Sequence, residues 1–218
     1  MISLSEILHT IAQALMIPCL IILIILMAGA VWQIGDIVVE YIAERRKHKC
    51  NVPQLLRDVH AAGADGLAEL IENSGLLRRQ KKALLELAES RGLPKDTLTA
   101  LAERLLATEE ARNARTTSIT DMIAKLGPMF GLLGTLIPLG PGIVALGQGD
   151  TVTLSESMNV AFDTTIAGVI SAAVASVISH IRKRWYNDDM VSLETLMEAV
   201  LEEVTSDVAV SYTHLRAH

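Results

Sequence analysis

The sequence is poor in aromatic residues, in cysteine and in charge, and each shortage excludes a class of protein. Phe, Trp and Tyr make up 3% of the 218 residues, too few for a membrane β-barrel with aromatic girdles or a base-stacking surface. Two cysteines cannot build a disulfide framework, and a net charge of -6 argues against a nucleic-acid partner. Charged residues reach only 20%, whereas hydrophobic residues reach 50%. A soluble domain does not need so apolar a composition, so we expect lipid-facing surface.

The sequence also lacks the patterns of an enzyme. It contains no Ser/His dyad, no phosphate-binding glycine loop and no His/Cys set at metal-ligand spacing. His48 and His60 have no partners at ligand spacing, and His180 stands at the end of an apolar run. We therefore predict no catalytic residue, no metal site and no cofactor.

Three long runs are nearly free of charge, and each is long enough to cross a bilayer. The first lies between Glu6 and Asp36 and has an almost purely aliphatic centre at 17–27. About 20 apolar residues in a helix span the hydrocarbon core, so residues 1–38 are predicted to hold a transmembrane helix. The alternative is a cleaved signal peptide, which normally begins with basic residues that are missing here.

The other two runs are predicted to form a transmembrane hairpin over residues 126–181. The second run, between Lys125 and Asp150, is rich in Gly and Pro, which membrane helices tolerate better than soluble ones. The third run extends from about Met158 to Ile181, and 153–156 (Thr-Leu-Ser-Glu) resembles a capping box at its start.

The basic residues predict the orientation of the spans. All 19 Lys and Arg lie within 43–125, in 182–184 or at Arg216, and none precedes the first span or lies in 148–157. The positive-inside rule therefore places the N-terminus and this turn outside, and the long loop and the C-terminus in the cytoplasm.

The cytoplasmic segments are predicted to be helical. Residues 39–125 show amphipathic stretches separated by breaks at 73–75 and 91–94, and 182–209 resumes an acidic amphipathic helix. Within it, 182–186 (Arg-Lys-Arg-Trp-Tyr) is predicted to be an interface anchor. The charges form either a solvated helical face or a docking surface. Residues 210–218 break the acidic pattern and resemble a non-native tail, which would leave the native C-terminus missing.

Small residues recur at helical spacing in the second and third runs, which predicts close helix packing. The stripe comprises Gly127, Gly131, Gly134, Pro138 and Gly142 in the second run, and Gly168 and Ala172 in the third.

A few polar residues within the hairpin are candidates for an ion path. A carboxylate at the centre of a membrane helix costs at least ~2.5 kcal/mol, so Asp163, with Asn159 and Thr164 near it, is predicted to face a polar cavity. The alternative is that Asp163 reaches the outer interface. Thr135 either bonds back to its own helix or, paired with Thr165, lines a hydrated path.

Two segments resemble motifs of the MotA/TolQ/ExbB proton-channel family. These are 128–135 (Pro-Met-Phe-Gly-Leu-Leu-Gly-Thr) and 163–168 (Asp-Thr-Thr-Ile-Ala-Gly), and the predicted topology is also similar. The resemblance implies an all-α membrane protein of the prokaryotic inner membrane that forms a homopentamer. It also implies a partner like ExbD, TolR or MotB, which crosses the membrane once and whose aspartate carries the ion past Thr135 and Thr165. Ion flow would then drive mechanical work.

The sequence departs from the family at one position of the third run. Many ExbB- and TolQ-like members carry a glutamate five residues before the threonine, where this chain has Val160 and, three residues later, Asp163. Three spans place the chain nearer to ExbB and TolQ than to MotA. A membrane scaffold that oligomerises without conducting ions is the alternative function.

Overall fold

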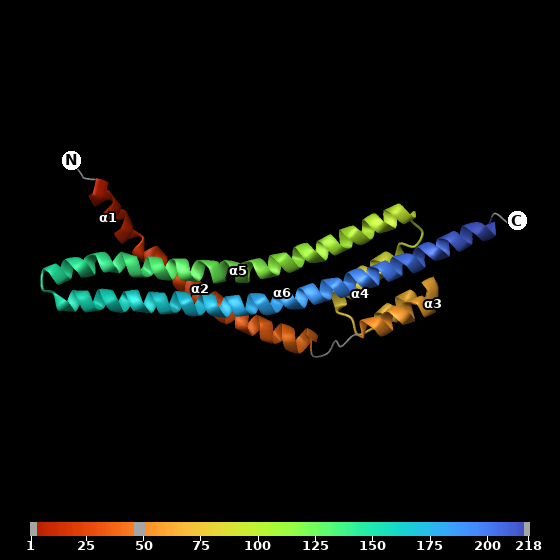
Figure 1. Cartoon of the computed structure of the whole chain (residues 1–218), viewed down its shortest axis with the longest axis horizontal. Helices are drawn as coiled ribbons and strands as arrows, with labels where there is room; N and C mark the ends of the chain where they lie inside the picture. Colours follow the sequence, from red (N-terminus) through yellow and green to blue (C-terminus); the bar gives the residue numbers. More distant parts are fainter. Residues whose placement is uncertain (1–3, 46–50, 216–218) are drawn as a thin grey trace. The chain divides into compact units, whose positions relative to one another are not determined.

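The computed structural model describes residues 4–45 and 51–215, all of them in helices or short connections. His48 and Arg216 lie outside the described residues. Figure 1 shows the helices in chain order. They are α1 (Leu4–Ala14), α2 (Met16–Glu40), the π-helical turn η1 (Tyr41–Arg45), α3 (Val52–Asn73), α4 (Arg78–Glu89), α5 (Lys95–Gly147) and α6 (Thr151–Leu215).

The chain divides into two compact units, and α5 and α6 contribute to both. The membrane unit comprises Met1–Ile37 and Thr116–Arg182, and the loop unit comprises Val38–Arg115 and Lys183–His218. Within the described residues, three helical segments are long and apolar enough to cross a membrane, as predicted: Thr10–Ala43, Lys95–Gly147 and Thr151–Ser206. The second and third spans are therefore parts of two long helices that continue into the loop unit without a break.

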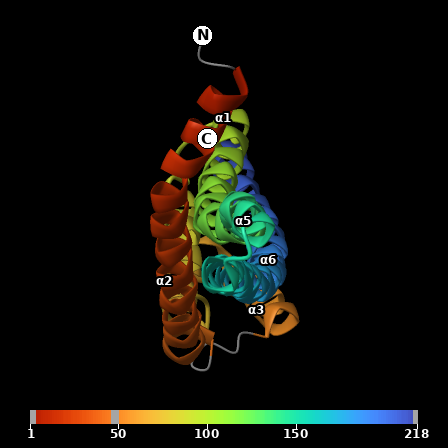
Figure 2. The ribbon, with the colours of Figure 1, turned by 90° about the vertical axis from the view of Figure 1, so that its left-hand side faces the viewer.

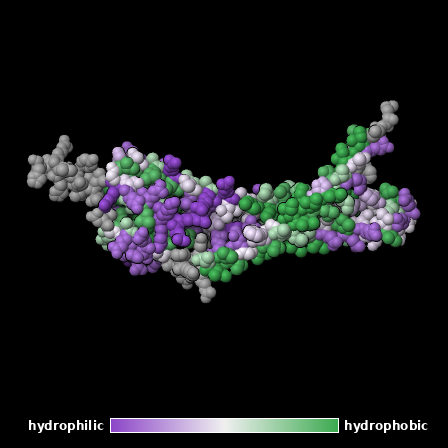
Figure 3. Space-filling view, turned by 180° about the vertical axis from the view of Figure 1, so that it is seen from behind, coloured by the Kyte–Doolittle hydropathy of each residue, from purple (hydrophilic) through white to green (hydrophobic). Residues whose placement is uncertain are grey.

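In the membrane unit, α5 and α6 form an antiparallel hairpin, and α2 packs along it (Figures 1 and 2). Leu26 and Ala30 of α2 lie in one apolar cluster with Ile123 of α5 and Ala175 of α6. Apolar side chains also gather on the outside of this unit, as the green area in Figure 3 shows. Hydrocarbon requires such an apolar exterior, and helices of this length are long enough to cross it.

The prolines of the second span lie inside α5 without ending it. Pro128, Pro138 and Pro141 are all within the helix, and none of the described peptide bonds is cis. A helix in water would lose stability at each of them because proline lacks the N–H for the intrahelical bond. Membrane helices tolerate such gaps because neighbouring helices and local adjustments satisfy the freed carbonyls.

The start of α6 differs from the sequence prediction. The helix begins at Thr151, and Asp150 Oδ1 accepts hydrogen bonds of 3.1 Å from the backbone N–H groups of Val152 and Thr153. Thr153 therefore does not act as the first cap of a box with Glu156; its hydroxyl donates to Asp150 Oδ2 at 2.6 Å. Aspartate is one of the preferred N-cap residues, so α6 begins directly after Asp150 and is not capped by Thr153.

The loop unit has a core of large aliphatic side chains. Long side chains of α6 contribute one face of it at steps of three and four residues, and the packing partners come from α3, α4 and the first part of α5. The fully buried members include Leu67, Ile71, Leu84, Leu87, Leu98, Leu193, Leu196, Met197 and Val200.

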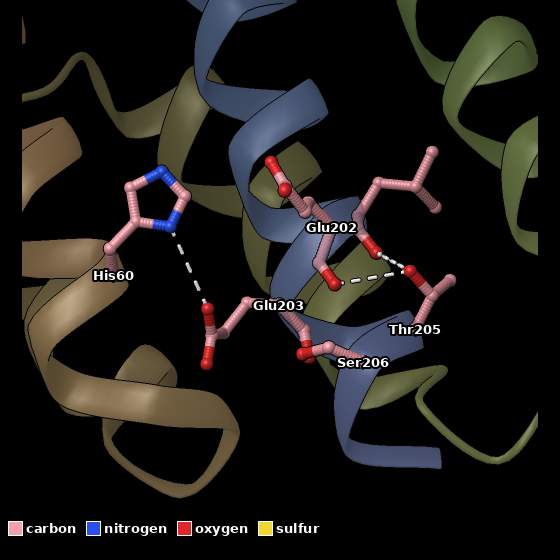
Figure 4. Close-up of polar contacts among 6 residues, drawn as sticks. His60, Glu202, Glu203, Thr205 and Ser206 are labelled. Atoms are coloured by element: carbon pink, nitrogen blue, oxygen red, sulfur yellow. Dashed lines mark hydrogen bonds and ion pairs between the residues drawn. The ribbon is translucent and has the colours of Figure 1, made fainter. Parts of the chain in front are cut away.

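Polar contacts add to this core at its edges. The amide of Gln80 accepts a hydrogen bond from Leu77 N at 3.2 Å and donates one to Asp189 O at 3.0 Å, which joins α4 to α6. On the other side, His60 Nδ1 of α3 lies 3.7 Å from Glu203 Oε2 of α6 (Figure 4). The His60 side chain is 51% exposed, so this pair contributes little to stability.

Candidate functional site

The hairpin of α5 and α6 is held by glycines that bring the two backbones together. A Cβ atom built on Gly168 would lie 2.5 Å from Gly127 O and 2.8 Å from Gly131 Cα. A Cβ atom built on Gly127 would lie 2.7 Å from Gly168 O. No real side chain tolerates such distances to backbone atoms, so only glycine fits at these two positions. The small-residue stripe thus lies at the helix–helix contact, where its lack of side chains permits the approach.

The remaining residues of the stripe lie along the same contact. Ala172 is 7% exposed, and its Cβ would lie 3.1 Å from a Cβ built on Gly127. Towards the turn, a Cβ built on Gly142 would lie 3.2 Å from Ser157 Cβ, and Pro138 is buried as well. The hairpin is therefore closely packed from Gly127 to Gly142 of α5.

Thr164 belongs to this contact and not to an open surface. Its side chain is 4% exposed, and a Cβ built on Gly134 would lie 2.6 Å from Thr164 Cβ. The hydroxyl donates back to its own helix, at 2.9 Å from both Val160 O and Ala161 O. Thr164 therefore fills the space that Gly134 leaves free.

Thr135 and Thr165 lie on the same side of the hairpin. Gly134 and Thr164 face each other in the contact, and Thr135 and Thr165 are the residues that directly follow them. One residue further along an α-helix is a rotation of about 100° around the helix axis. In antiparallel helices these two rotations carry both side chains to the same side of the pair. A Cβ built on Gly131 would lie 3.6 Å from Thr165 Cα, which agrees with this placement. We call this side of the hairpin the threonine face.

The hydroxyls of the threonine face are satisfied within their own helices. Thr135 Oγ1 donates to Leu132 O at 2.7 Å, and Thr165 Oγ1 donates to Ala161 O at 3.0 Å. Both side chains are half-buried in the single chain. Each hydroxyl oxygen keeps acceptor capacity, so the face can accept hydrogen bonds from water or solvate a cation.

Asp163 and Asn159 lie on the opposite side of α6. Asp163 stands two residues before Thr165, about 200° around the helix, whereas Asn159 stands four residues before Asp163 and shares its side. Both side chains are exposed in the single chain. The structure thus brings together two pairs, Thr135 with Thr165 and Asn159 with Asp163, and it separates one pair from the other.

The first membrane helix covers the side of α5 that is remote from the threonines. Leu133 lies two residues before Thr135, so its side chain points to the opposite side of α5. Leu133 and Phe130 pack against a cluster that contains Leu23 of α2 and Ile137 of α5. Within the membrane unit, α2 therefore leaves the threonine face uncovered.

The turn between the two helices contains one perturbed acid. The side-chain and backbone hydrogen bonds from Thr153, together with the backbone bond from Val152, lower the pKa of Asp150 below its ordinary value. The capped turn therefore carries a negative charge at every physiological pH. Elsewhere in the described residues, no three His, Cys, Asp or Glu side chains form a group that could hold a metal ion.

A polar cluster at the other end of the hairpin was not predicted from the sequence. Arg182 was predicted to be part of an interface anchor, but its side chain is 1% exposed and pairs with Gln33 and Asp36 of α2. One signal was available in the sequence. Arg182 follows Thr164 by 18 residues, five turns at 3.6 residues each, so it shares the packed face of α6.

Comparison with known proteins agrees with these features. The model of the MotA/TolQ/ExbB proton channel family matches residues 70–195, more than half of the chain, including both helices of the hairpin. A search of curated proteins finds no match. Three described helices long and apolar enough to cross a membrane, the glycine-packed hairpin and the extent of the match lead to one conclusion: the chain belongs to the MotA/TolQ/ExbB proton channel family.

Proposed function

We propose that this chain is the conducting subunit of a membrane motor driven by a gradient of protons or sodium ions. The observation that carries the proposal is that α2 leaves the threonine face of the hairpin uncovered. In a ring of hairpins, this face turns inward and α2 lies outside against lipid. Thr135 and Thr165 then line the ion path, in a part of the hairpin where α6 carries no basic residue.

The proposed assembly is a homopentamer in the prokaryotic inner membrane, with the N-terminus outside and the C-terminus in the cytoplasm. A dimeric partner like ExbD, TolR or MotB, with one transmembrane helix in each chain, occupies the centre of the ring. Its membrane carboxylate takes up and releases the ion beside the threonine face. A potential of 100 mV acting on one charge supplies about 2.3 kcal/mol, which is the source of the mechanical work.

Asp163 and Asn159 take a different place in this assembly. An ionised carboxylate that faces hydrocarbon costs at least ~2.5 kcal/mol, so an exposed Asp163 needs a polar neighbour. A second copy of the chain provides one if the Asn159–Asp163 side of α6 lies at the seam between neighbouring subunits. There Asp163 pairs with a neighbouring subunit and points away from the ion path that the threonine face lines.

The experiment is a flux measurement in vesicles that contain this chain together with a candidate single-span partner. Replacing both Thr135 and Thr165 by Val removes two hydroxyls without changing side-chain size. Each lost hydrogen bond to the ion or its water raises the barrier enough to lower the rate about tenfold. Thr164→Val is the matched control, because Thr164 faces Gly134 inside the hairpin and its variant should conduct as before.

The outcomes separate the motor from the scaffold. Gradient-driven flux that falls in the double variant and persists in Thr164→Val supports the proposed path. An intact oligomer that shows no flux with the partner present would identify the chain as a non-conducting scaffold. Unchanged flux in the double variant would contradict the assignment of Thr135 and Thr165.

A further inference from the structure

A buried arginine links α2, α5 and α6 at the end of the hairpin that is remote from its turn. Arg182 of α6 is 1% exposed, and its Nη1 donates to Gln33 Oε1 of α2 at 2.7 Å. Its Nη2 lies 2.5 Å from Asp36 Oδ2, also of α2. The amide oxygen of Gln33 accepts a second hydrogen bond, at 3.2 Å, from Thr120 Oγ1 of α5. The guanidinium group of α6 thus binds α2 directly and is linked to α5 through Gln33.

The same end of the hairpin holds a second polar link. Ser179 Oγ of α6 donates to Asp121 Oδ1 of α5, one helical turn before Arg182. Thr120 and Ser179 are 0% and 3% exposed, so most of this cluster is closed to solvent. Two acids and one arginine therefore lie together with amide and hydroxyl groups, and no buried side-chain polar atom in the described residues lacks a partner.

The apolar part of the interface between α2 and the hairpin does not by itself determine how α2 is placed. Its contacts are made largely by Leu23, Leu26 and Ala30, which are buried against aliphatic and small side chains of α5 and α6. In a bilayer, lipid tails are as apolar as leucine, so sliding or rotating such a helix loses little hydrophobic energy. A buried charge behaves differently, because a guanidinium group cannot lose its proton and must keep its partners.

We propose that Arg182 is a positioning residue that sets the register and rotation of α2 on the hairpin. Only one placement of α2 brings Gln33 and Asp36 to the guanidinium group together. Arg182 shares the packed face of α6 with Thr164, so it does not lie on the threonine face and acts through α2 alone. This assignment goes beyond the proposed function and does not depend on ion conduction.

The experiment is disulfide cross-linking of α2 to α5 in membranes that contain the full-length chain. Cys19 and Cys50 are first replaced by Ser. The native-register pair is Gly29→Cys with Ile123→Cys, since a Cβ built on Gly29 lies 3.1 Å from Ile123 Cδ1. The off-register pair is Ile25→Cys with Ile123→Cys, because Ile25 is 62% exposed and points away from the hairpin.

Each cysteine pair is then combined with a substitution of Arg182 or Asp36. Arg182→Gln should lower the ratio of native to off-register cross-links by at least about threefold, the factor that one average interhelical polar interaction in a membrane represents. Asp36→Asn should shift the ratio in the same direction by less, because the Asp36 side chain is 54% exposed. Arg182→Lys keeps the positive charge but loses the two-pronged guanidinium group. Its cross-link ratio should therefore lie between those of Arg182→Gln and the wild type.

Arg184→Gln is the matched control, because it removes a nearby exposed positive charge and should leave the ratio unchanged. A fall of the ratio in Arg182→Gln and Asp36→Asn but not in Arg184→Gln supports the proposal. If Arg182→Gln does not accumulate in the membrane, Asp36→Asn decides the result. A wild-type ratio in every cluster variant that accumulates would overturn the proposal, whatever the vesicles show about ion flux.

Discussion

The two units of the chain use the same two long helices but pack them in opposite ways. In the membrane unit, α5 and α6 meet through Gly127, Gly131 and Gly168, with backbone close to backbone. In the loop unit, the same helices bury large aliphatic side chains such as Leu98 and Leu196. The difference follows from the surrounding solvent. Burying a leucine gains free energy only where the alternative is water, whereas in lipid the gain comes from close contact of small residues.

The surrounding solvent also explains where polar groups are buried. Among the described residues, the loop unit buries one polar side chain, Gln80, which joins α4 to α6, whereas the membrane unit buries seven. The membrane unit buries its most polar cluster, around Arg182, between three helices. In lipid no water is available to hydrogen-bond such groups, so their partners must lie inside the protein.

The largest effect is expected from a side chain placed at the closest backbone contact. Gly168→Val puts atoms where a Cβ alone would lie 2.5 Å from Gly127 O, and neither backbone can retreat without separating the helices. The cost should exceed the roughly 1–3 kcal/mol of ordinary overpacking. Limited proteolysis in membranes should show an open hairpin in this variant.

Gly140→Ala is the matched control for this prediction. A Cβ built on Gly140 meets no atom within 4 Å, so its variant should be as resistant to proteolysis as the unchanged protein. Equal resistance of Gly168→Val and Gly140→Ala would show that the glycine contact does not hold the hairpin.

A smaller but substantial effect is expected from truncating the core of the loop unit. Leu87 is 0% exposed, and Leu87→Ala should lower the free energy of unfolding of this unit by about 2–5 kcal/mol. The same truncation at Leu132, which is 61% exposed in the membrane unit, should cost far less. Denaturant unfolding in mild detergent, followed by hydrogen exchange of each unit, measures both. Similar losses at the two positions would contradict the contrast between the units.

The smallest effect concerns the cap of α6. Because the pKa of Asp150 is lowered in the folded protein, its capping bonds stabilise the turn fully above the ordinary aspartate pKa. They are lost as the pH falls through the lowered pKa. The thermal unfolding midpoint should therefore drop in acid. Asp150→Asn keeps a capping oxygen that does not titrate, so the midpoint of this variant should drop less. A steeper acid dependence in Asp150→Asn would show that the carboxylate is not stabilising.

Much of this arrangement could be predicted from the sequence, because hydropathy and spacing act locally. The three spans follow from uncharged runs, and the stripe from Gly127 to Gly142 indicated the helix contact. The burial of Arg182 was only weakly indicated by its spacing from Thr164, since a basic cluster after a span usually marks the interface. Its burial depends on Gln33 and Asp36, roughly 150 residues away in the chain.

The candidate site shows the same limit. Thr165 and Asp163 are close in sequence, so they look like parts of one polar site. Two residues along an α-helix are a rotation of about 200°, so their side chains lie on opposite sides of α6. Which side faces a path depends on where α2 packs. That contact is tertiary, and the pattern of small residues does not encode it by itself.

In the proposed assembly, the threonine face borders water and the outer surface of α2 borders lipid. Single cysteines at Thr165, on that face, and at Ile24, which is 62% exposed on α2, test it directly in the assembled complex. A water-soluble thiol reagent should modify Thr165→Cys rapidly and Ile24→Cys hardly at all. Equal rates at the two positions, or faster modification of Ile24→Cys, would contradict the claim.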